Sequence, residues 1–260
     1  MAWTKHVKGK LGRVLEQAEE RGWLSRVDGF RRDYAGEYPE LAVLEREHAT
    51  IRRECEALLP RKEAMVDMER LGGAYTRSKV HTVRWKTFMF KSGRFVEDNC
   101  RLAPSTAEML RSVPGLYTAF FSVLDPHQHI PPHWGYWKGF LRYHLGVIVP
   151  NDNANGECWI RVNSDPDDNR GRDPSAIERG RRYYWREGEG VLFDDTFLHE
   201  ARNESDQVRV VLFLDVARKM PLPLQAYNRF VLEAAHLAPP VARIRRIARL
   251  GTAPTQVARR

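Results

Sequence analysis

The middle of the chain carries a series of short apolar runs that strongly limits its fold. These runs are rich in β-branched and aromatic residues: YTAFFSVL, GFLRYHLGVIVP, ECWIRVN, RRYYWR, GEGVLFD and VRVVLFLDVA. Gly, Pro, Asn or Asp separates each run from the next. Repeated short strands at this spacing are typical of an all-β barrel or jelly roll. We therefore predict a mainly β fold.

The segments on either side of this region carry apolar residues at helical spacing. Between residues 10 and 60, which we predict to be helical, the spacing is set by Leu41, Leu44, Ile51, Cys55 and Leu58, with Pro39 and Pro60 as boundaries. We expect one domain in three parts. These are an N-terminal helical extension packed on the barrel, a β core, and a C-terminal helical segment with a basic tail, over residues 1–73, 74–220 and 221–260.

Three shorter segments allow local predictions. VHTVRWKTFMFKSG, residues 80–93, alternates well enough for one or two strands. STAEMLRSVPG, residues 105–115, predicts a short helix that Ser105 or Thr106 could cap. Residues 164–182 are polar and contain two prolines, which indicates a long loop beside the barrel mouth.

The C-terminal segment VARIRRIARL, residues 241–250, is basic and amphipathic. The simpler interpretation is a helix packed on the barrel with its arginines in solvent. The alternative is weak attachment to anionic lipid headgroups. The last ten residues, GTAPTQVARR, have the composition of a disordered tail.

Composition and charge limit the class of partner. The chain is 42% hydrophobic and 29% charged, as expected of a folded protein, and its net charge of +8 favours anionic substrates or surfaces. The sequence contains no zinc-finger or RNP motif, so we do not expect nucleic-acid binding. A small molecule, a peptide or a lipid, in each case anionic, is the expected substrate.

The cysteines and the hydropathy pattern indicate the cellular location of the chain. Cys55, Cys100 and Cys158 are odd in number and lack a Cys-x-x-Cys spacing, which argues against a disulfide framework and against structural zinc. The N-terminus lacks the apolar run of a signal peptide, and no stretch of about 18 apolar residues predicts a membrane span. We therefore expect a cytoplasmic location, with at most peripheral contact to lipid.

Histidines gather at two points of the β-rich region. His127, His129 and His133 lie in a predicted turn, DPHQHIPPHWG, directly after one strand, and His199 lies in FDDTFLHEARN at the end of another. A single histidine is more often a surface or core residue than a ligand. Two well-separated segments at strand ends, however, are the arrangement of the two-histidine oxygenases, and imidazole suits iron, zinc or copper. The spacing therefore makes a metal site one possible role of these histidines, beside a surface or core role.

Two arginines interrupt apolar strands. Arg142 lies in LRYHL and Arg209 in VRVVLF, where burial of a charge is unfavourable without an anionic partner. A guanidinium can bind a carboxylate through two parallel hydrogen bonds. Either arginine could instead point outward by the alternation of a strand. The two are candidates for binding a dicarboxylate.

These segments together carry a resemblance to a known family. FSVLDPHQHIPPHWGYWKGFLRYHLGVIVP, CWIRV and WREGEGVLFDDTFLHEARNESDQVRVVLFLDV, within residues 85–218, resemble the aspartyl/asparaginyl β-hydroxylases in residue type and spacing. Bacterial lipid A hydroxylases are relatives of that family. The resemblance implies a double-stranded β-helix (jelly roll, cupin-like) with flanking helices. It also implies a dioxygenase that uses iron(II), 2-oxoglutarate and O2.

The resemblance implies the metal ligands. His133 matches the first iron ligand and His199 the second. His127 and His129 are not assigned as ligands, because His133 holds the ligand position of the motif.

The resemblance also implies a cosubstrate site. Arg209 matches the arginine that pairs with the distal carboxylate of 2-oxoglutarate, with Ser122 as its hydroxyl partner. Arg142 and His144 match the pair near the other carboxylate of the cosubstrate and the substrate.

Gly135 departs from the commoner His-x-Asp or His-x-Glu pattern of this chemistry. Glycine cannot ligate a metal, so water or substrate must fill that position, as in animal aspartyl hydroxylases, which also have glycine. The lipid A hydroxylases carry aspartate there. Halogenases of the superfamily bind chloride in the vacant position. Three readings stay open: a two-histidine hydroxylase, a halogenase, or a weakened iron site.

Other residues near these motifs receive a supporting role. Asp194 and Asp195 precede the second histidine, where we expect them to orient it or to fix a turn. We expect Trp85, Trp134 and Trp137 to line or cover the mouth, although aromatic residues are more often core.

The main functional prediction is hydroxylation of an unactivated C–H bond, at the β-carbon of an aspartyl or asparaginyl residue or a related small molecule. The alternative is a hydroxylase of a lipid acyl chain. A halogenase and a silent module that binds 2-oxoglutarate are further alternatives.

Overall fold

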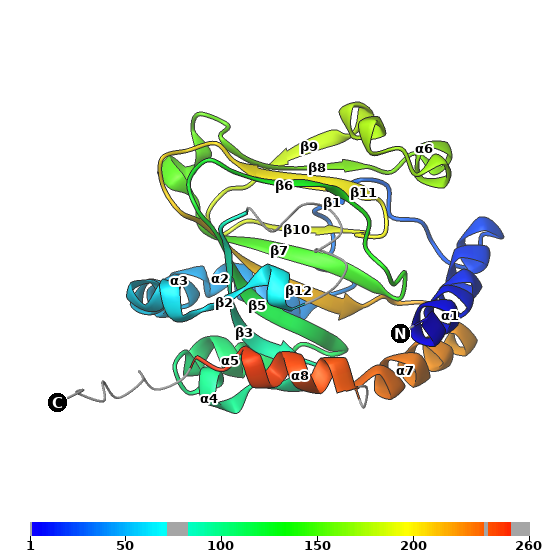
Figure 1. Cartoon of the computed structure of the whole chain (residues 1–260), viewed down its shortest axis with the longest axis horizontal. Helices are drawn as coiled ribbons and strands as arrows, with labels where there is room; N and C mark the ends of the chain where they lie inside the picture. The colour runs from blue at the N-terminus through cyan, green and yellow to red at the C-terminus, as the bar shows by residue number, and fades with distance from the viewer. Residues whose placement is uncertain (1, 72–82, 237–238, 251–260) are drawn as a thin grey trace.

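A computed structural model describes residues 2–71, 83–236 and 239–250 (Figure 1). It contains two antiparallel sheets that face each other, flanked by helices. The strands are β1 Phe30–Arg31, β2 Val66–Asp67, β3 Trp85–Ser92, β4 Arg94–Phe95, β5 Leu116–Leu124, β6 Gln128–His133, β7 Phe140–Ile148, β8 Cys158–Asn163, β9 Arg181–Tyr184, β10 Gly190–Phe193, β11 Leu198–Asn203 and β12 Arg209–Ala217.

The larger sheet has the order β1-β10-β7-β12-β5-β3-β2, with β4 paired to β3, and the smaller sheet has the order β6-β11-β8-β9. The central neighbours of each sheet, such as β7 with β12, β12 with β5, and β6 with β11, are distant in sequence, as a jelly roll requires. The predicted mainly β, jelly-roll class is confirmed. The α-helices are α1 Ala2–Glu20, α2 Pro39–Arg46, α3 His48–Leu58, α4 Glu97–Cys100, α5 Pro104–Arg111, α6 Pro166–Gly171, α7 Leu222–His236 and α8 Pro239–Ile247.

Strict alternation gives the larger sheet two different faces. On β12, the outer face carries Val210, Leu212, Leu214 and Val216, and the inner face carries Arg209, Val211, Phe213 and Asp215. The neighbouring strands β5 and β7 alternate in the same way. Ser122, Arg142 and His144 therefore lie on the inner face, toward the smaller sheet.

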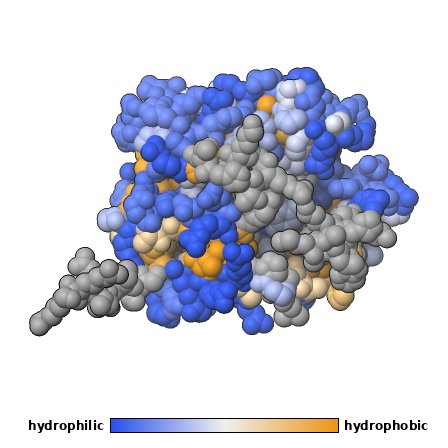
Figure 2. All heavy atoms as spheres, viewed as in Figure 1, coloured by the Kyte–Doolittle hydropathy of each residue, from blue (hydrophilic) through white to orange (hydrophobic). Residues whose placement is uncertain are grey.

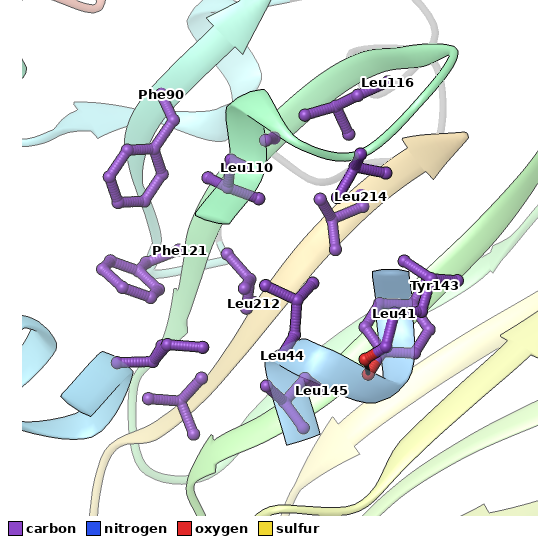
Figure 3. Packing of buried hydrophobic residues seen from close by; sticks show 14 of the residues in the cluster. Leu41, Leu44, Phe90, Leu110, Leu116, Phe121, Tyr143, Leu145, Leu212 and Leu214 are labelled. Carbon is purple, nitrogen blue, oxygen red and sulfur yellow. Dashed lines mark hydrogen bonds between the residues drawn. The ribbon is translucent and has the colours of Figure 1, made fainter. Parts of the chain in front are cut away.

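The outer face is closed by helices. Leucines of α2 and α5 pack on aliphatic and aromatic side chains of β3, β5, β7 and β12, as Figure 3 shows for Leu41, Leu44, Leu110, Phe121 and Leu212. These side chains are fully or almost fully buried. This apolar layer holds the larger sheet against the N-terminal helices.

The segment predicted to be helical between residues 10 and 60 is only partly so. α1, α2 and α3 lie in it, but β1 pairs with β10, which makes the helical prediction wrong at Phe30–Arg31. Gly29 precedes β1 with φ of +62°, a conformation that interrupts a helix and favours glycine.

The two strands that carry the histidine motifs, β6 and β11, were not predicted as strands. β6 contains Pro131 and Pro132, which argue against a strand in the sequence. They are accommodated because β6 is an edge strand of the smaller sheet. The region read as a turn is therefore a strand, paired to β11.

The predicted loop over residues 164–182 has more structure than expected. It contains α6 and the 3-10 helix η6 Pro174–Arg179, and the side chains of Asp165 and Asp173 cap them. The further 3-10 helices are η1 Leu59–Ala64, η2 Met68–Arg70 and η5 Pro150–Asn153.

The predicted helix after residue 104 is α5, but its cap differs. Glu54 of α3 accepts hydrogen bonds from the backbone N–H groups of Ser105 and Thr106, at 2.8 Å each. The expected capping by a Ser or Thr side chain is wrong, because a carboxylate from another helix satisfies these donors.

The remaining sequence predictions concern cysteines, the membrane and the C-terminus. The three cysteines form no disulfide, as expected, and all three are buried. No helix in the described ranges is long and apolar enough to cross a membrane. The predicted basic helix is α8, whereas the expected tail over residues 251–260 lies outside the described residues.

Candidate active site

The two predicted metal ligands lie side by side on the smaller sheet. His133 on β6 is the direct cross-strand neighbour of His199 on β11, and their ring centroids are 4.1 Å apart. A β-bulge shifts the register between His199 and Ala201, which pairs with Ile130. The bulge leaves both histidines on the face that meets the larger sheet.

The hydrogen bonds of the two rings fix their tautomer. Nδ1 of His133 lies 2.8 Å from the carbonyl oxygen of Pro131, and Nδ1 of His199 lies 2.8 Å from that of Phe197. A carbonyl oxygen can only accept, so each Nδ1 carries the proton and donates it. In each ring Nε2 therefore carries the lone pair, which is the tautomer of a histidine that ligates a metal through Nε2.

Burial keeps both rings neutral. It lowers the pKa of His133 to about 4 and holds the pKa of His199 well below its ordinary value, with the nearby Arg142 acting in the same direction. Neutral imidazole is the form that binds a metal. Within residues 2–71, 83–236 and 239–250, no group of three or more His, Cys, Asp or Glu side chains could hold a metal together. The candidate ligand set is thus a histidine pair.

Arg209 is the most unusual charged group of the inner face. Its side chain is 1% exposed, lies over the ring of Trp185 at 4.6 Å, and donates to the backbone carbonyl of Ser122 at 3.3 Å. No carboxylate of the described chain pairs with it, and its Nε has no hydrogen-bond partner there. Burial lowers its pKa to about 10. A buried guanidinium in this state fits an anionic ligand.

His144 lies in the same space. Its ring contacts those of Trp185, Phe193 and Phe213, with centroids 5.8, 5.2 and 5.1 Å away. Neither ring nitrogen has a hydrogen-bond partner among the described residues, and the indole N–H of Trp185 lacks one as well. Buried polar atoms are normally paired, so this cluster indicates a place for a polar ligand.

Ser122 completes the predicted cosubstrate residues on β5. Its hydroxyl accepts a hydrogen bond from the indole N–H of Trp85 at 2.8 Å. Trp85 is 4% exposed, so it supports Ser122 from the inside and does not cover a mouth. Thr87, the cross-strand neighbour of Ser122, has a buried hydroxyl without a partner in the described chain.

Arg142 differs from Arg209 because it is already paired. Its Nε and Nη2 donate to Oδ1 of Asp215, at 3.0 and 2.9 Å, and Nη2 lies 2.8 Å from Oδ2 of Asp195. All three side chains are buried. Arg142 is therefore held in place by protein carboxylates.

Gly135 lies against Asp195, which explains the glycine. A Cβ at residue 135 would come within 2.1 Å of Oδ2 of Asp195, and the N–H of Gly135 donates to the Asp195 carbonyl at 2.7 Å. Burial raises the pKa of Asp195 to about 7, although Arg142 opposes this rise. Its Oδ1 has no partner in the described chain. The carboxyl group of Asp195 thus occupies the space that a side chain at residue 135 would need.

The turn before His199 is anchored by buried ion pairs. Asp194 accepts from Lys138 and Arg218 at 3.0 and 2.9 Å, and from the backbone and hydroxyl of Thr196 at 3.0 and 2.6 Å. Lys138 and Arg218 also contact Glu19 of α1, at 2.7 and 2.8 Å. The expected orienting role of Asp194 therefore extends to the N-terminal helix.

Several residues near the motifs face away from this space. His127 pairs with Asp206 and His129 with Glu200, at 2.8 and 2.7 Å. Trp134 donates to Asn169 at 3.0 Å. Trp137 is 5% exposed and packs between α1 and α7, so it belongs to a core and not to a mouth.

Comparison with known proteins identifies the family. The profile described as aspartyl/asparaginyl β-hydroxylase matches residues 45–219, which is most of the chain. The chain belongs to this family. The resemblance predicted from the sequence is confirmed.

Two relatives show how far the similarity extends. An ornithine lipid ester-linked acyl 2-hydroxylase of Rhizobium tropici is 32% identical over 203 residues, covering 78% of this chain and 66% of the relative. The aspartyl/asparaginyl β-hydroxylase of Homo sapiens is 28% identical over 138 residues, covering 51% of this chain and 16% of the relative. The chain thus spans less than two thirds of either relative.

A solved structure is also similar. A prolyl-4-hydroxylase of Pseudomonas putida matches with a TM-score of 0.39 and 14% identity, over 69% of this chain and 99% of that one.

Some residues of the family site were missed by sequence reasoning. Asp215, in VVLFLDVA, is a carboxylate inside an apolar strand and could have been recognised as a buried partner for Arg142. Trp185 and Thr87 gave no such signal, because aromatic and β-branched residues are ordinary in strands. Glu19 lies outside the family match, and its contact with Lys138 depends on how α1 packs.

Proposed function

We propose that this hydroxylase-family protein is an iron(II)- and 2-oxoglutarate-dependent dioxygenase that hydroxylates an unactivated C–H bond. One observation carries the proposal. Arg209 is a buried cation without a carboxylate in the described chain, and it lies in the same inter-sheet space as His144, whose ring nitrogens also lack partners. A dicarboxylate would satisfy these groups.

His133 and His199 are the proposed iron ligands. Their Nδ1 atoms donate to backbone carbonyls, so in each ring it is Nε2 that carries the lone pair with which imidazole ligates a metal. With dioxygen and 2-oxoglutarate, bound iron(II) supplies the oxidation that inserts one oxygen atom into a C–H bond while the cosubstrate becomes succinate and carbon dioxide. The chain contributes ligation, orientation and the exclusion of water.

The cosubstrate residues act by charge and hydrogen bonding. We assign Arg209 to the distal carboxylate of 2-oxoglutarate, with the hydroxyl of Ser122 as a further donor. His144 and Arg142 are assigned to the other carboxylate and the substrate. Because Arg142 is held by Asp195 and Asp215, it contributes a fixed positive charge beside the site.

The halogenase is a further alternative. Gly135 offers no ligand, and the buried carboxyl group of Asp195 lies in the space beside it.

Two substrate classes remain. The family profile and the human relative favour the β-carbon of an aspartyl or asparaginyl residue, or a related small molecule. A lipid acyl chain is the second candidate, and the relative whose match covers 78% of this chain favours it. The net charge of +8 suits an anionic substrate of either kind. The three-part division at residues 73 and 220 and a cytoplasmic location remain predictions.

The test is conversion of 2-oxoglutarate to succinate by the purified chain with iron(II). We expect uncoupled conversion alone, and stimulation by one of two pools: peptides that contain Asp or Asn, or a lipid extract. Mass spectrometry should show a gain of one oxygen in that pool. Conversion in neither condition with retained 2-oxoglutarate binding would leave the silent binding module, whereas loss of binding as well would leave another function. A product that requires chloride would assign a halogenase.

A further inference from the structure

The helix α7 is apolar on two sides, yet only one of them is buried. Leu224, Asn228, Val231 and Leu232 face α1 and the larger sheet. On the opposite side, Leu222, Ala226, Phe230 and Ala234 form an exposed row at intervals of four residues. Leu222 is 79% and Phe230 72% exposed. We call this row the α7 apolar row; Figure 2 shows its helix as pale orange atoms at the lower right of the molecule.

The segments packed with α7 also expose apolar side chains. Of the seven large hydrophobic side chains that are exposed in the described chain, five belong to α1, α7 and the two segments packed with them: Val14, Trp23, Tyr136, Leu222 and Phe230. The cluster formed by Leu15, Trp137 and Leu232 holds these segments together. Exposed apolar side chains gathered in one part of a protein mark an interaction surface.

The chain segment that carries the α7 apolar row is positively charged. Residues 219–250 contain six Lys or Arg and one acidic residue, Glu233, which gives a difference of +5 (6 − 1) within a chain of net charge +8. Arg229 precedes Phe230, and Arg243 and Arg246 are exposed on α8. No carboxylate of the described chain forms a salt bridge with these three arginines. Apolar side chains between cations suit the headgroup region of an anionic bilayer.

The row is connected to the candidate active site through the buried side of α7. Asn228 accepts from the indole N–H of Trp137 and donates to the carbonyl of Gly139, each at 2.9 Å. These residues belong to the segment that directly follows His133. A surface that docks α7 would therefore hold the segment that borders the metal ligands.

We propose that the α7 apolar row and its flanking arginines dock this protein onto the surface of a membrane that contains anionic lipids. A second copy of the chain fits less well, because the same positive charges would face each other across the contact. The proposal adds a membrane-binding surface to the lipid alternative of the proposed function. The identity of the substrate rests on that proposed function, whereas the docking does not.

Vesicle binding tests the proposal. Wild-type chain should sediment with vesicles of phosphatidylcholine that contain phosphatidylglycerol, and far less with pure phosphatidylcholine. A variant with Leu222→Glu and Phe230→Glu should bind about tenfold less or weaker still, since each side chain loses a favourable apolar transfer. The matched control is Leu102→Glu with Tyr184→Glu, the two exposed apolar side chains outside this surface, and it should bind like wild type.

Three outcomes would overturn the docking. One is no binding to either vesicle, the second is equal binding to both, and the third is equal loss in the control variant. A dimer in solution that Leu222→Glu and Phe230→Glu abolish, without vesicle binding, would assign the row to a second copy. Uncoupled formation of succinate by the same samples separates failure of this inference from failure of the proposed function, because it requires no lipid.

Discussion

The two faces of the larger sheet differ in how completely their side chains are satisfied. The outer face is apolar and closed by α2, α3 and α5, and its side chains are packed on one another. The inner face carries Arg142, His144 and Arg209, and several of its buried polar atoms have no partner in the described chain. The outer face therefore stabilises the fold. The inner face has buried polar groups whose hydrogen bonds a bound ligand would complete. Substitutions on the two faces should have opposite signatures.

The largest effect should come from His199→Ala. Loss of one of two proposed ligands should abolish turnover and iron binding, while the free energy of unfolding of the metal-free protein changes little. Iron titration and succinate formation measure the first two, and denaturant unfolding the third. His129→Ala, which removes a histidine paired with Glu200 on the other side of β6, is the control and should stay active. Retained iron binding in His199→Ala would reject the ligand assignment.

The outer face should show the reverse signature in Leu212→Ala. Leu212 is fully buried in the layer between the sheet and the helices. Truncation of a buried leucine costs about 2–5 kcal/mol of folding free energy. Denaturant unfolding should report that loss, while the 2-oxoglutarate requirement of the remaining folded protein stays unchanged. A large change in that requirement would mean that the two faces are not independent.

Arg209→Met should separate function from stability on the inner face. Burial lowers the pKa of Arg209 to about 10. Arg209 is still charged at pH 7, but its charge is less stable in the folded state than in the unfolded state. Removing the charge should leave the melting temperature of the ligand-free protein unchanged or raise it. The 2-oxoglutarate requirement should rise roughly 10- to 150-fold, because a charge-assisted contact is lost.

The decisive measurement for Arg209 is thermal unfolding with and without 2-oxoglutarate. The ligand should stabilise wild type and have little effect on Arg209→Met, since stabilisation follows affinity. Equal stabilisation of both proteins would remove Arg209 from the cosubstrate site.

The difference between the faces also explains what could be predicted from the sequence. Alternation in VRVVLFLDVA and LRYHL gave the strands, and the outer leucines follow from that pattern alone. Whether Arg209 points inward or outward did not follow, because alternation fixes opposite faces but not which one meets helices. β6 was missed since its prolines look like a turn, and their place on an edge strand depends on the whole sheet.

Contacts between segments far apart in the chain are the other features that could not be predicted from the sequence. In the sequence, Gly135 stood out only because a carboxylate is usual at that position. The structure explains the glycine, because Asp195 of the β10–β11 turn leaves no room for a side chain there. The link from Glu19 to Asp194 through Lys138 depends on how α1 packs, which no local pattern encodes. Both features require the folded arrangement of elements far apart in the chain.

Gly135→Ala should destabilise the inner face moderately. The added Cβ would collide with the Asp195 carboxylate, and overpacking of this kind costs about 1–3 kcal/mol. The double variant Gly135→Ala with Asp195→Gly should recover part of the loss, which denaturant unfolding can measure as a coupling between the two sites. Gly36→Ala, where a Cβ would meet nothing within 4 Å, is the control. Additive effects would contradict the contact.

The smallest expected effect is a pH dependence of stability that belongs to the inner face. Burial raises the pKa of Asp195 to about 7, above its ordinary value of 3.8, so the folded state holds the proton more tightly than the unfolded state. Stability from this group is therefore present below the unfolded pKa and is lost as the pH rises toward 7. Asp195→Asn should remove that loss. The free energy of unfolding of the variant relative to wild type should rise between pH 4 and pH 7 and then level off, as measured by denaturant unfolding across that range. A difference that stays constant with pH would mean that Asp195 is ionised throughout and that Arg142 outweighs burial.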